Sequence, residues 1–341
     1  MHSQNELLFL ALNRITFLRP REKLLLADLL GSLQDLVKFG RKDLVHCLGR
    51  SPRARVWQPE DYARLAECDK KYLTKANIKY TFYREEDYPA PLAEIYDPPL
   101  VLYYRGGPLR RKSSLAAVVG TRQPSEKALM RAYSLGVEFG AARIGVVSGL
   151  ARGIDTAVHK GCLSIGGPAI AVMGNGIDMV YPASSKSTAA KILEQGGCLV
   201  SEYPPGVLPQ KYHFPERNRI ISGLAAAVVV IEAPRKSGAL ITADFALEQG
   251  RELFVHKAGL EGVTGEGTRL LHEQGAAAID NAYPVIKELR GNPGRPVLAG
   301  GKNSGLRFEV RGESGRALAH MLELELEEKL SVYNGEYYRS E

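Results

Sequence analysis

The chain has 341 residues, of which 45% are hydrophobic and 24% charged, a composition typical of soluble globular proteins. Its formal net charge of +7 permits a nucleic-acid partner without requiring one. The four cysteines form no C-x-x-C pair, which argues against a zinc site or a disulfide framework. No apolar run is long enough to span a bilayer and no signal peptide is recognisable, so we expect a cytoplasmic protein without membrane association.

Residues 1–77 are expected to form a small helical domain. Leucines recur at spacings of three and four in NELLFLALNRI and again in PREKLLLADLLGSLQDLVKF. This spacing predicts helices with one apolar face, and Pro20 is a residue that suits a helix start.

Residues 78–290 change to strands that alternate with helices. The runs LAAVVG, IGVVSG, AIAVMG and AAVVVIEA are continuous in apolar residues, and the first three lead through a glycine-containing turn into a helical segment. Such strands are typical of a parallel sheet that is covered by helices on both faces. We therefore predict an α/β fold with a doubly wound parallel sheet.

The last part of the chain is predicted to hold a linker and a short module. Residues 291–305 are rich in glycine and proline and are expected to form the linker. In residues 306–341 we expect a helix and then two short strands around Asn334–Gly335. That order resembles the second half of a winged helix, whose leading part is not recognisable.

The candidate site is a set of glycine-containing loops after three predicted strands, at 120–122, 148–153 and 174–176. Ligands of an open parallel sheet bind beyond the carboxyl ends of its strands. Glycines let backbone amides approach an anion, and the following helix N-termini favour one. Arginine and lysine side chains complement phosphate oxygens. The sequence therefore predicts a phosphate-binding site lined by Arg122, Arg152, Lys186, Arg217 and Arg219.

Other polar and aromatic residues near these loops have two interpretations each. Asp155 is expected to cap its helix or to pair with an arginine, and His159 to pack inside. His213 is a candidate to line the site, whereas Phe214 either stacks on a base or fills the core. There is no P-loop, no dinucleotide fingerprint and no local catalytic triad. We therefore expect binding without catalysis and without a metal, although each glycine alone is also explained by a tight turn.

Six segments of this region carry a recognisable pattern: VVGTR, VVSGLARGIDTAVHKGCL, IAVMGNGIDMVYP, LVSEYPPG, FPERNRIISGL and SGALITADFALEQGRELF. Together they resemble the DNA-processing protein A family (DprA, also called Smf). The resemblance spans residues 87–280 and implies an extended Rossmann-like fold, a homodimer and no enzymatic activity or cofactor. It implies binding of single-stranded DNA, protection of incoming DNA in natural transformation, and loading of the RecA recombinase.

The resemblance also assigns individual residues. Arg122, beside Gly120, matches the arginine of the first loop that contacts DNA phosphate. Gly149, Arg152 and Gly153 match the second loop. Arg217 and Arg219 match the family's RNR motif, and Lys186 matches a basic residue after Tyr-Pro. Leu270 and Leu271 are expected near the dimer and RecA surfaces. Independently of the resemblance, His213 and Phe214 are possible base contacts.

Two other functions remain open from sequence. Rossmann-like hydrolases that cleave nucleoside monophosphates carry a Gly-Gly-x-Gly-Thr-x-x-Glu signature. In the comparable stretch, SGALITADFALE, Gly238 stands alone and Phe245 replaces the glutamate three residues after Thr242. The third possibility is a scaffold whose pocket stores a small phosphorylated molecule.

Overall fold

The leucine-rich N-terminal segment forms five helices, as its spacing predicts. The computed structural model describes residues 2–52, 56–109, 114–291, 330–333 and 336–339. Pro20 and Pro59 begin the second and fifth helices, and the Ser32 side chain caps the third by accepting from the Asp35 amide. The helices are α1 (His2–Arg14), α2 (Pro20–Leu29), α3 (Leu33–Lys38), α4 (Arg41–Leu48) and α5 (Pro59–Lys75).

The apolar runs form the strands of one sheet, which has nine strands among the described residues, in the order β1-β2-β6-β5-β4-β3-β7-β8-β9. The strands β3 to β9 are parallel, while β2 is antiparallel to β6 and β1 antiparallel to β2. The chain therefore winds outward from β3 in both directions. The strands are β1 (Lys79–Phe82), β2 (Val101–Gly106), β3 (Leu115–Val119), β4 (Gly145–Ser148), β5 (Ala169–Val172), β6 (Cys198–Ser201), β7 (Ala227–Val230), β8 (Glu252–His256) and β9 (Ala277–Ile279).

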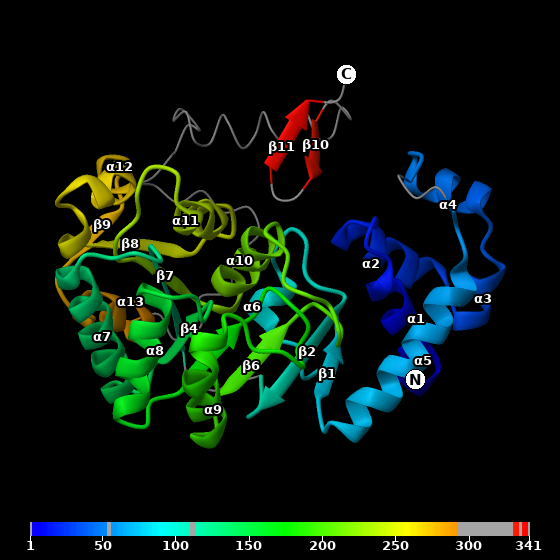
Figure 1. Ribbon diagram of the computed structural model, residues 1–341, viewed down its shortest axis with the longest axis horizontal. Coiled ribbons are helices and arrows are strands. Elements are labelled where there is room, and N and C mark those ends of the chain that lie inside the picture. Colours follow the sequence, from blue (N-terminus) through cyan, green and yellow to red (C-terminus); the bar gives the residue numbers. More distant parts are fainter. Residues whose placement is uncertain (1, 53–55, 110–113, 292–329, 334–335, 340–341) are drawn as a thin grey trace.

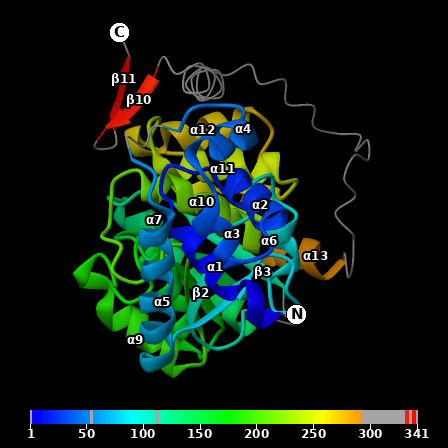
Figure 2. The same ribbon diagram turned by 90° about the vertical axis from the view of Figure 1, so that its right-hand side faces the viewer.

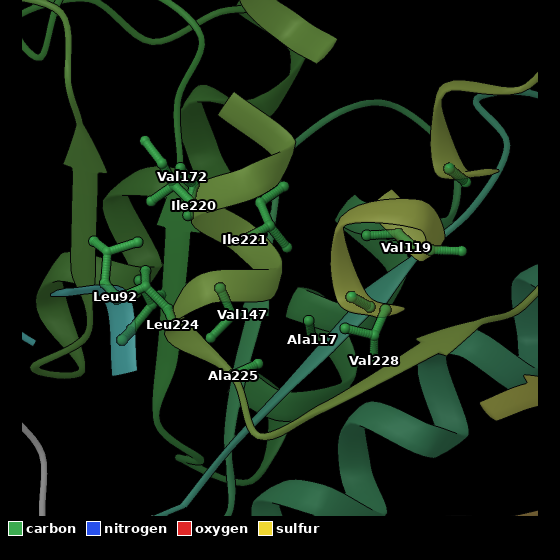
Figure 3. Close-up of a cluster of buried hydrophobic side chains, with 14 of the residues drawn as sticks. Leu92, Ala117, Val119, Val147, Val172, Ile220, Ile221, Leu224, Ala225 and Val228 are labelled. Carbon is green, nitrogen blue, oxygen red and sulfur yellow. The ribbon is translucent and has the colours of Figure 1, made fainter. Parts of the chain in front are cut away.

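Helices cover both faces of this sheet because alternate strand residues point to opposite sides. Figure 3 shows side chains of α10, among them Ile220 and Leu224, beside strand residues such as Val147 and Val172. On the other face Phe139 and its neighbours on α7 pack on Val118 together with α8 and α13. The helices are α6 (Ala90–Ala93), α7 (Glu126–Ala141), α8 (Ile154–Ser164), α9 (Lys186–Glu194), α10 (His213–Leu224), α11 (Gly238–Glu248), α12 (Glu266–Glu273) and α13 (Tyr283–Gly291).

The N-terminal helices share a hydrophobic core with the β1–β2–β6–β5 end of the sheet. Leu8 and Leu12 of α1 are fully buried in the same cluster as Tyr103 of β2 and Leu199 of β6. Figures 1 and 2 show these helices gathered at that end of the molecule. The helical segment therefore packs directly on the sheet through a shared apolar core.

The predicted α/β, doubly wound, Rossmann-like fold is confirmed. The two C-terminal strands are present as the hairpin β10 (Leu330–Tyr333) and β11 (Glu336–Arg339), whereas the predicted linker and the helix before the hairpin lie outside the described residues. The helical segment ends with α5 and the sheet begins with β1, on either side of the predicted boundary at residue 77. The assignment of separate domains stays a prediction.

Candidate nucleic-acid interface

The carboxyl edge of the sheet brings together the loops after β3, β4 and β5. The strand order reverses between β3 and β7, and ligands of doubly wound sheets bind at such a switch point. The Ile154 amide, which follows the second loop, donates to the Thr121 carbonyl at 3.3 Å. The Ser185 hydroxyl, just before α9, donates to the Leu150 carbonyl at 2.9 Å. These bonds join the first loop to the second, and the second loop to the segment before α9.

Two of the predicted glycines allow the first and second loops to touch. A Cβ on Gly120 would lie 2.6 Å from Cγ1 of Ile154. Gly153 has φ +79°, and a Cβ there would lie 2.5 Å from the Thr121 carbonyl oxygen and 2.9 Å from the carbonyl carbon of Arg122. Close packing of the loops explains both glycines.

Carboxylates of the chain itself accept from two amides of the second loop and from one amide at the start of α7. The Asp155 carboxylate accepts from the amides of Gly149 at 3.1 Å and Ala151 at 3.4 Å, and burial raises its pKa. The Glu232 carboxylate, after β7, accepts from the Ser125 amide and hydroxyl at the start of α7, the hydroxyl at 2.5 Å. A phosphate seated directly on these amides, as the glycines suggest, would have to displace a buried carboxylate.

Arg217 is enclosed by the protein. It is 4% exposed, and its guanidinium donates to the Gly149 carbonyl at 2.7 Å and to the Val172 carbonyl. A Cβ on Gly149 would lie 2.2 Å from that guanidinium, so the glycine makes room for the arginine. Burial lowers the pKa of Arg217 to about 10, and the nearby Asp155 carboxylate opposes the shift. Its role here is to hold the second and third loops.

Arg219 is also buried, at 4% exposure, and it points into an ionic cluster. Its Nη2 lies 2.6 Å from Glu202 and its Nε 3.5 Å from Asp97. Burial disfavours its charge, but these two carboxylates outweigh burial and raise its pKa. The prediction that Arg217 and Arg219 contact phosphate therefore stays untested, and the packing favours a supporting role for both.

Arg122, Arg152 and Lys186 are exposed on this edge, and among the described residues none of them pairs with a carboxylate. Lys186 is the first residue of α9, whose first turn holds no acidic residue. A 3-10 turn at Ala183–Ser185 runs directly into α9. The role of Lys186 as a phosphate contact stays a prediction.

Phe214 lies under the exposed Arg122. The Arg122 guanidinium is 5.4 Å from the centre of the Phe214 ring, and the Tyr181 ring, 46% exposed, is centred 5.7 Å from it. A Cβ on Gly174 would meet the Phe214 ring at 2.9 Å, so the third loop also closes on this ring. Phe214 is only half-buried, and it therefore belongs to the loop surface as well as to the packing beneath it.

His213 lies in a second group of aromatic rings. It is 6% exposed, and its ring centre lies 4.0 Å from that of Tyr203 and 4.6 Å from that of Tyr212. Its Nδ1 is buried without a hydrogen-bond partner in the part of the chain that the structure describes. Burial lowers its pKa, so the ring is neutral near pH 7.

Three exposed residues of this edge were missed by the sequence analysis: Tyr181, Lys211 and Tyr212. Lys211 and Tyr212 come directly before α10, and Tyr181 stands at the Tyr-Pro pair before α9. A basic residue next to aromatic residues at a strand–helix connection is the signal that could have found them.

The predicted partner surface is only partly open. Leu271 is 5% exposed and lies in the main core, whereas Leu270, beside it on α12, is half-buried. Leu271 is therefore unavailable to a partner in this conformation. Leu270 stays a prediction.

Titratable groups near this edge have shifted pKa values. Desolvation raises the pKa of Glu216, in the first turn of α10, to about 7. His159 is completely buried, and burial lowers its pKa to about 4, in keeping with the predicted packing role. Among the described residues, no cluster of three His, Cys, Asp or Glu side chains could hold a metal. Over the same residues, no helix is long and apolar enough to cross a membrane. The edge carries exposed cations and aromatic rings.

A doubly wound sheet with exposed cations and aromatic rings along its carboxyl edge makes this a Rossmann-like protein. Residues 79–290 match the sequence profile of a family described as DNA recombination-mediator protein A. The chain belongs to this family.

Individual relatives agree with that assignment. DNA processing protein DprA of Streptococcus pneumoniae is 38% identical over 229 residues, covering 66% of this chain and 80% of that protein. Protein Smf of Escherichia coli is 43% identical over 206 residues, covering 60% of this chain and 55% of that protein.

Two solved structures are also similar. The X-ray structure of DNA processing protein A from Streptococcus pneumoniae superposes with a TM-score of 0.64 at 30% identity, covering 82% of this chain and 95% of that one. A structure of DNA processing protein A from Helicobacter pylori is described as showing a unique single-stranded DNA binding mode. It superposes with a TM-score of 0.55 at 28% identity, covering 63% of this chain and 97% of that one.

Proposed function

We propose that this protein binds single-stranded DNA along the carboxyl edge of its sheet. The observation that carries the proposal is the exposed Arg122 guanidinium held 5.4 Å over Phe214, beside the exposed Tyr181 ring. Aromatic rings next to cations suit a single strand, because its bases are free to stack while its phosphates meet the charges. Arg152, Lys186 and Lys211 extend the basic surface on neighbouring loops.

The side chains, rather than the loop amides, are proposed to contact the phosphates. Asp155 already accepts from the Gly149 and Ala151 amides of the second loop, and Glu232 accepts from the Ser125 amide at the start of α7. If three to five phosphates are neutralised, the slope of log K against log salt is about −2 to −3.5 for a single strand.

Family membership supports the finer parts of the proposal. We infer that the protein acts in the cytoplasm during natural transformation and recombination, protecting incoming DNA and loading RecA onto it. It would do so as a homodimer and without catalysis or a cofactor. Leu270 of α12 remains a candidate for the dimer or RecA surface because it is half-buried and next to the core residue Leu271.

The alternative of a nucleoside monophosphate hydrolase is disfavoured by α11. Phe245 takes the place of the glutamate that such a hydrolase requires, and Gly238 at the start of the helix is the single glycine there. Incubation with AMP is expected to release no adenine. Release of adenine would favour the hydrolase.

The test of the main proposal is fluorescence anisotropy of a labelled single-stranded oligonucleotide with matched duplex as competitor. Arg122→Ala is expected to weaken binding about tenfold or more, because an arginine–phosphate contact contributes roughly 1.5–3 kcal/mol. Lys287→Ala is a charge-removing control: it is exposed on α13, which packs at the C-terminal end of α7 near the opposite edge of the sheet. Absent binding, or equal effects of both variants, would contradict the proposal.

A further inference from the structure

The segment 202–212 joins β6 to α10 and delivers Lys211 and Tyr212 to the proposed DNA-binding edge. Its sequence, EYPPGVLPQKY, contains three prolines, which lack the amide that a regular ladder needs. The Gly206 amide donates to the Asp178 carboxylate at 2.9 Å, and the Val207 carbonyl accepts from the Gly176 amide at 2.8 Å. Hydrogen bonds to Gly176 of the third glycine loop and to Asp178 just after it therefore hold this side of the segment.

The other side of this segment is held by the end of α1. The Asn13 side-chain amide donates to the Glu202 carbonyl at 2.9 Å and lies 3.3 Å from the Tyr103 hydroxyl. The Arg14 guanidinium donates to the Pro205 carbonyl at 2.8 Å, while its Nε donates to Asp69 of α5 at 2.6 Å. Two consecutive residues of the helical segment thus bind two carbonyls of the 202–212 segment.

The Asn13 and Arg14 side chains are held in place by contacts within the helical segment as well as by the 202–212 segment. Asn13 is 8% exposed and Asp69 4% exposed, and α1 is anchored by fully buried leucines in the core it shares with β2 and β6. Lys23 of α2 donates to the Asn13 carbonyl at 3.0 Å. The contact is a rigid support, because its donors lose little further freedom when they bind the carbonyls.

We propose that Asn13 and Arg14 are positioning residues for nucleic-acid binding. Through them the helical segment sets the conformation of residues 202–212, and so the placement of Lys211, Tyr212 and α10, without touching DNA itself. This inference rests on the proposed function. It gives the N-terminal helices a role in the affinity of a site that lies on another part of the molecule.

The test compares Asn13→Ala and the double variant Arg14→Ala/Asp69→Ala with Lys70→Ala in the full chain. The double variant avoids leaving Asp69 as an unpaired buried carboxylate. Lys70 pairs with Glu6 inside the same helical segment and is the matched control. We expect the first two variants to bind a single-stranded oligonucleotide about five- to tenfold more weakly, because the competent loop is less populated, and the control to be unchanged.

Two readouts separate positioning from the alternatives. The salt slope is expected to stay at the wild-type value, since no phosphate contact is lost, and hydrogen exchange in the free protein is expected to speed up in residues 203–212 but not in α1. A slope reduced by about 0.7 would overturn positioning in favour of direct contact. Unchanged affinity and exchange in the variants would overturn this inference alone, whereas no binding by the wild type would overturn the proposed function with it.

Discussion

Gly153 is the position where one methyl group should damage stability and binding together. Its φ of +79° is unfavourable for any other residue, and a Cβ would lie 2.5 Å from the Thr121 carbonyl oxygen and 2.9 Å from the backbone of Arg122. These neighbours are backbone atoms, which cannot rotate away as a side chain can. Gly153→Ala must therefore move the first loop, and Arg122 with it.

The size of the effect follows from a matched control, Gly166→Ala. Gly166 has a similar φ of +69°, but a Cβ at that position would have no atom within 4 Å, so its alanine variant is strained without a clash. We expect Gly166→Ala to lose about 1 kcal/mol of unfolding free energy from backbone strain. Gly153→Ala adds about 1–3 kcal/mol of overpacking, for a total of at least roughly 2–4 kcal/mol, because the ψ of −127° at Gly153 adds further backbone strain.

Urea unfolding with linear extrapolation measures the unfolding free energy of both variants, and oligonucleotide anisotropy measures their affinity for DNA. Displacement of Arg122 should weaken DNA binding by Gly153→Ala about tenfold, while Gly166→Ala binds like the wild type. The reasoning is refuted if both variants are equally stable and both keep the wild-type affinity.

Three further predictions concern single side chains. Tyr181→Ala should weaken oligonucleotide binding about tenfold by anisotropy, because base stacking on an aromatic ring contributes roughly 1–3 kcal/mol, while Tyr72→Ala, equally exposed on α5, should have no effect. Burial lowers the pKa of Lys23 from 10.5 to about 8, because the charged ammonium is disfavoured in the folded protein. The unfolding free energy therefore falls as pH drops from about 10.5 to 8 and Lys23 becomes protonated. In urea unfolding, the wild type should gain about 1 kcal/mol relative to Lys23→Met between pH 7 and pH 9. Glu232→Gln should lower the unfolding free energy by about 1 kcal/mol, since the charged acceptor at the start of α7 is lost, and no change in the urea midpoint would contradict that role.

Most of the sheet could be predicted from the sequence because its central strands are continuous runs of Val, Ile and Ala that carry a strong local signal. The strand β9 was missed because it has only three residues. The antiparallel direction of β1 and β2 could not be predicted, since the residues within a strand do not encode the direction of its neighbour.

The site was harder to predict because the sequence does not show which way an arginine points. Arg122 lies in the loop after β3 and is exposed, whereas Arg217 lies inside α10 and is enclosed between Gly149 and Val172. The glycines were interpreted as an approach for an anion, whereas Gly120 and Gly153 allow the loops to pack closely and Asp155 accepts from two amides of the second loop. These features depend on tertiary packing, which local patterns do not record.

The most direct test of single-strand binding through exposed side chains is the salt dependence of oligonucleotide affinity, for the wild type and for Arg122→Ala. The wild type should give a log–log slope between about −2 and −3.5, and the loss of one phosphate contact should reduce its magnitude by about 0.7. A wild-type slope near zero, or one that Arg122→Ala leaves unchanged, would contradict the proposed interface.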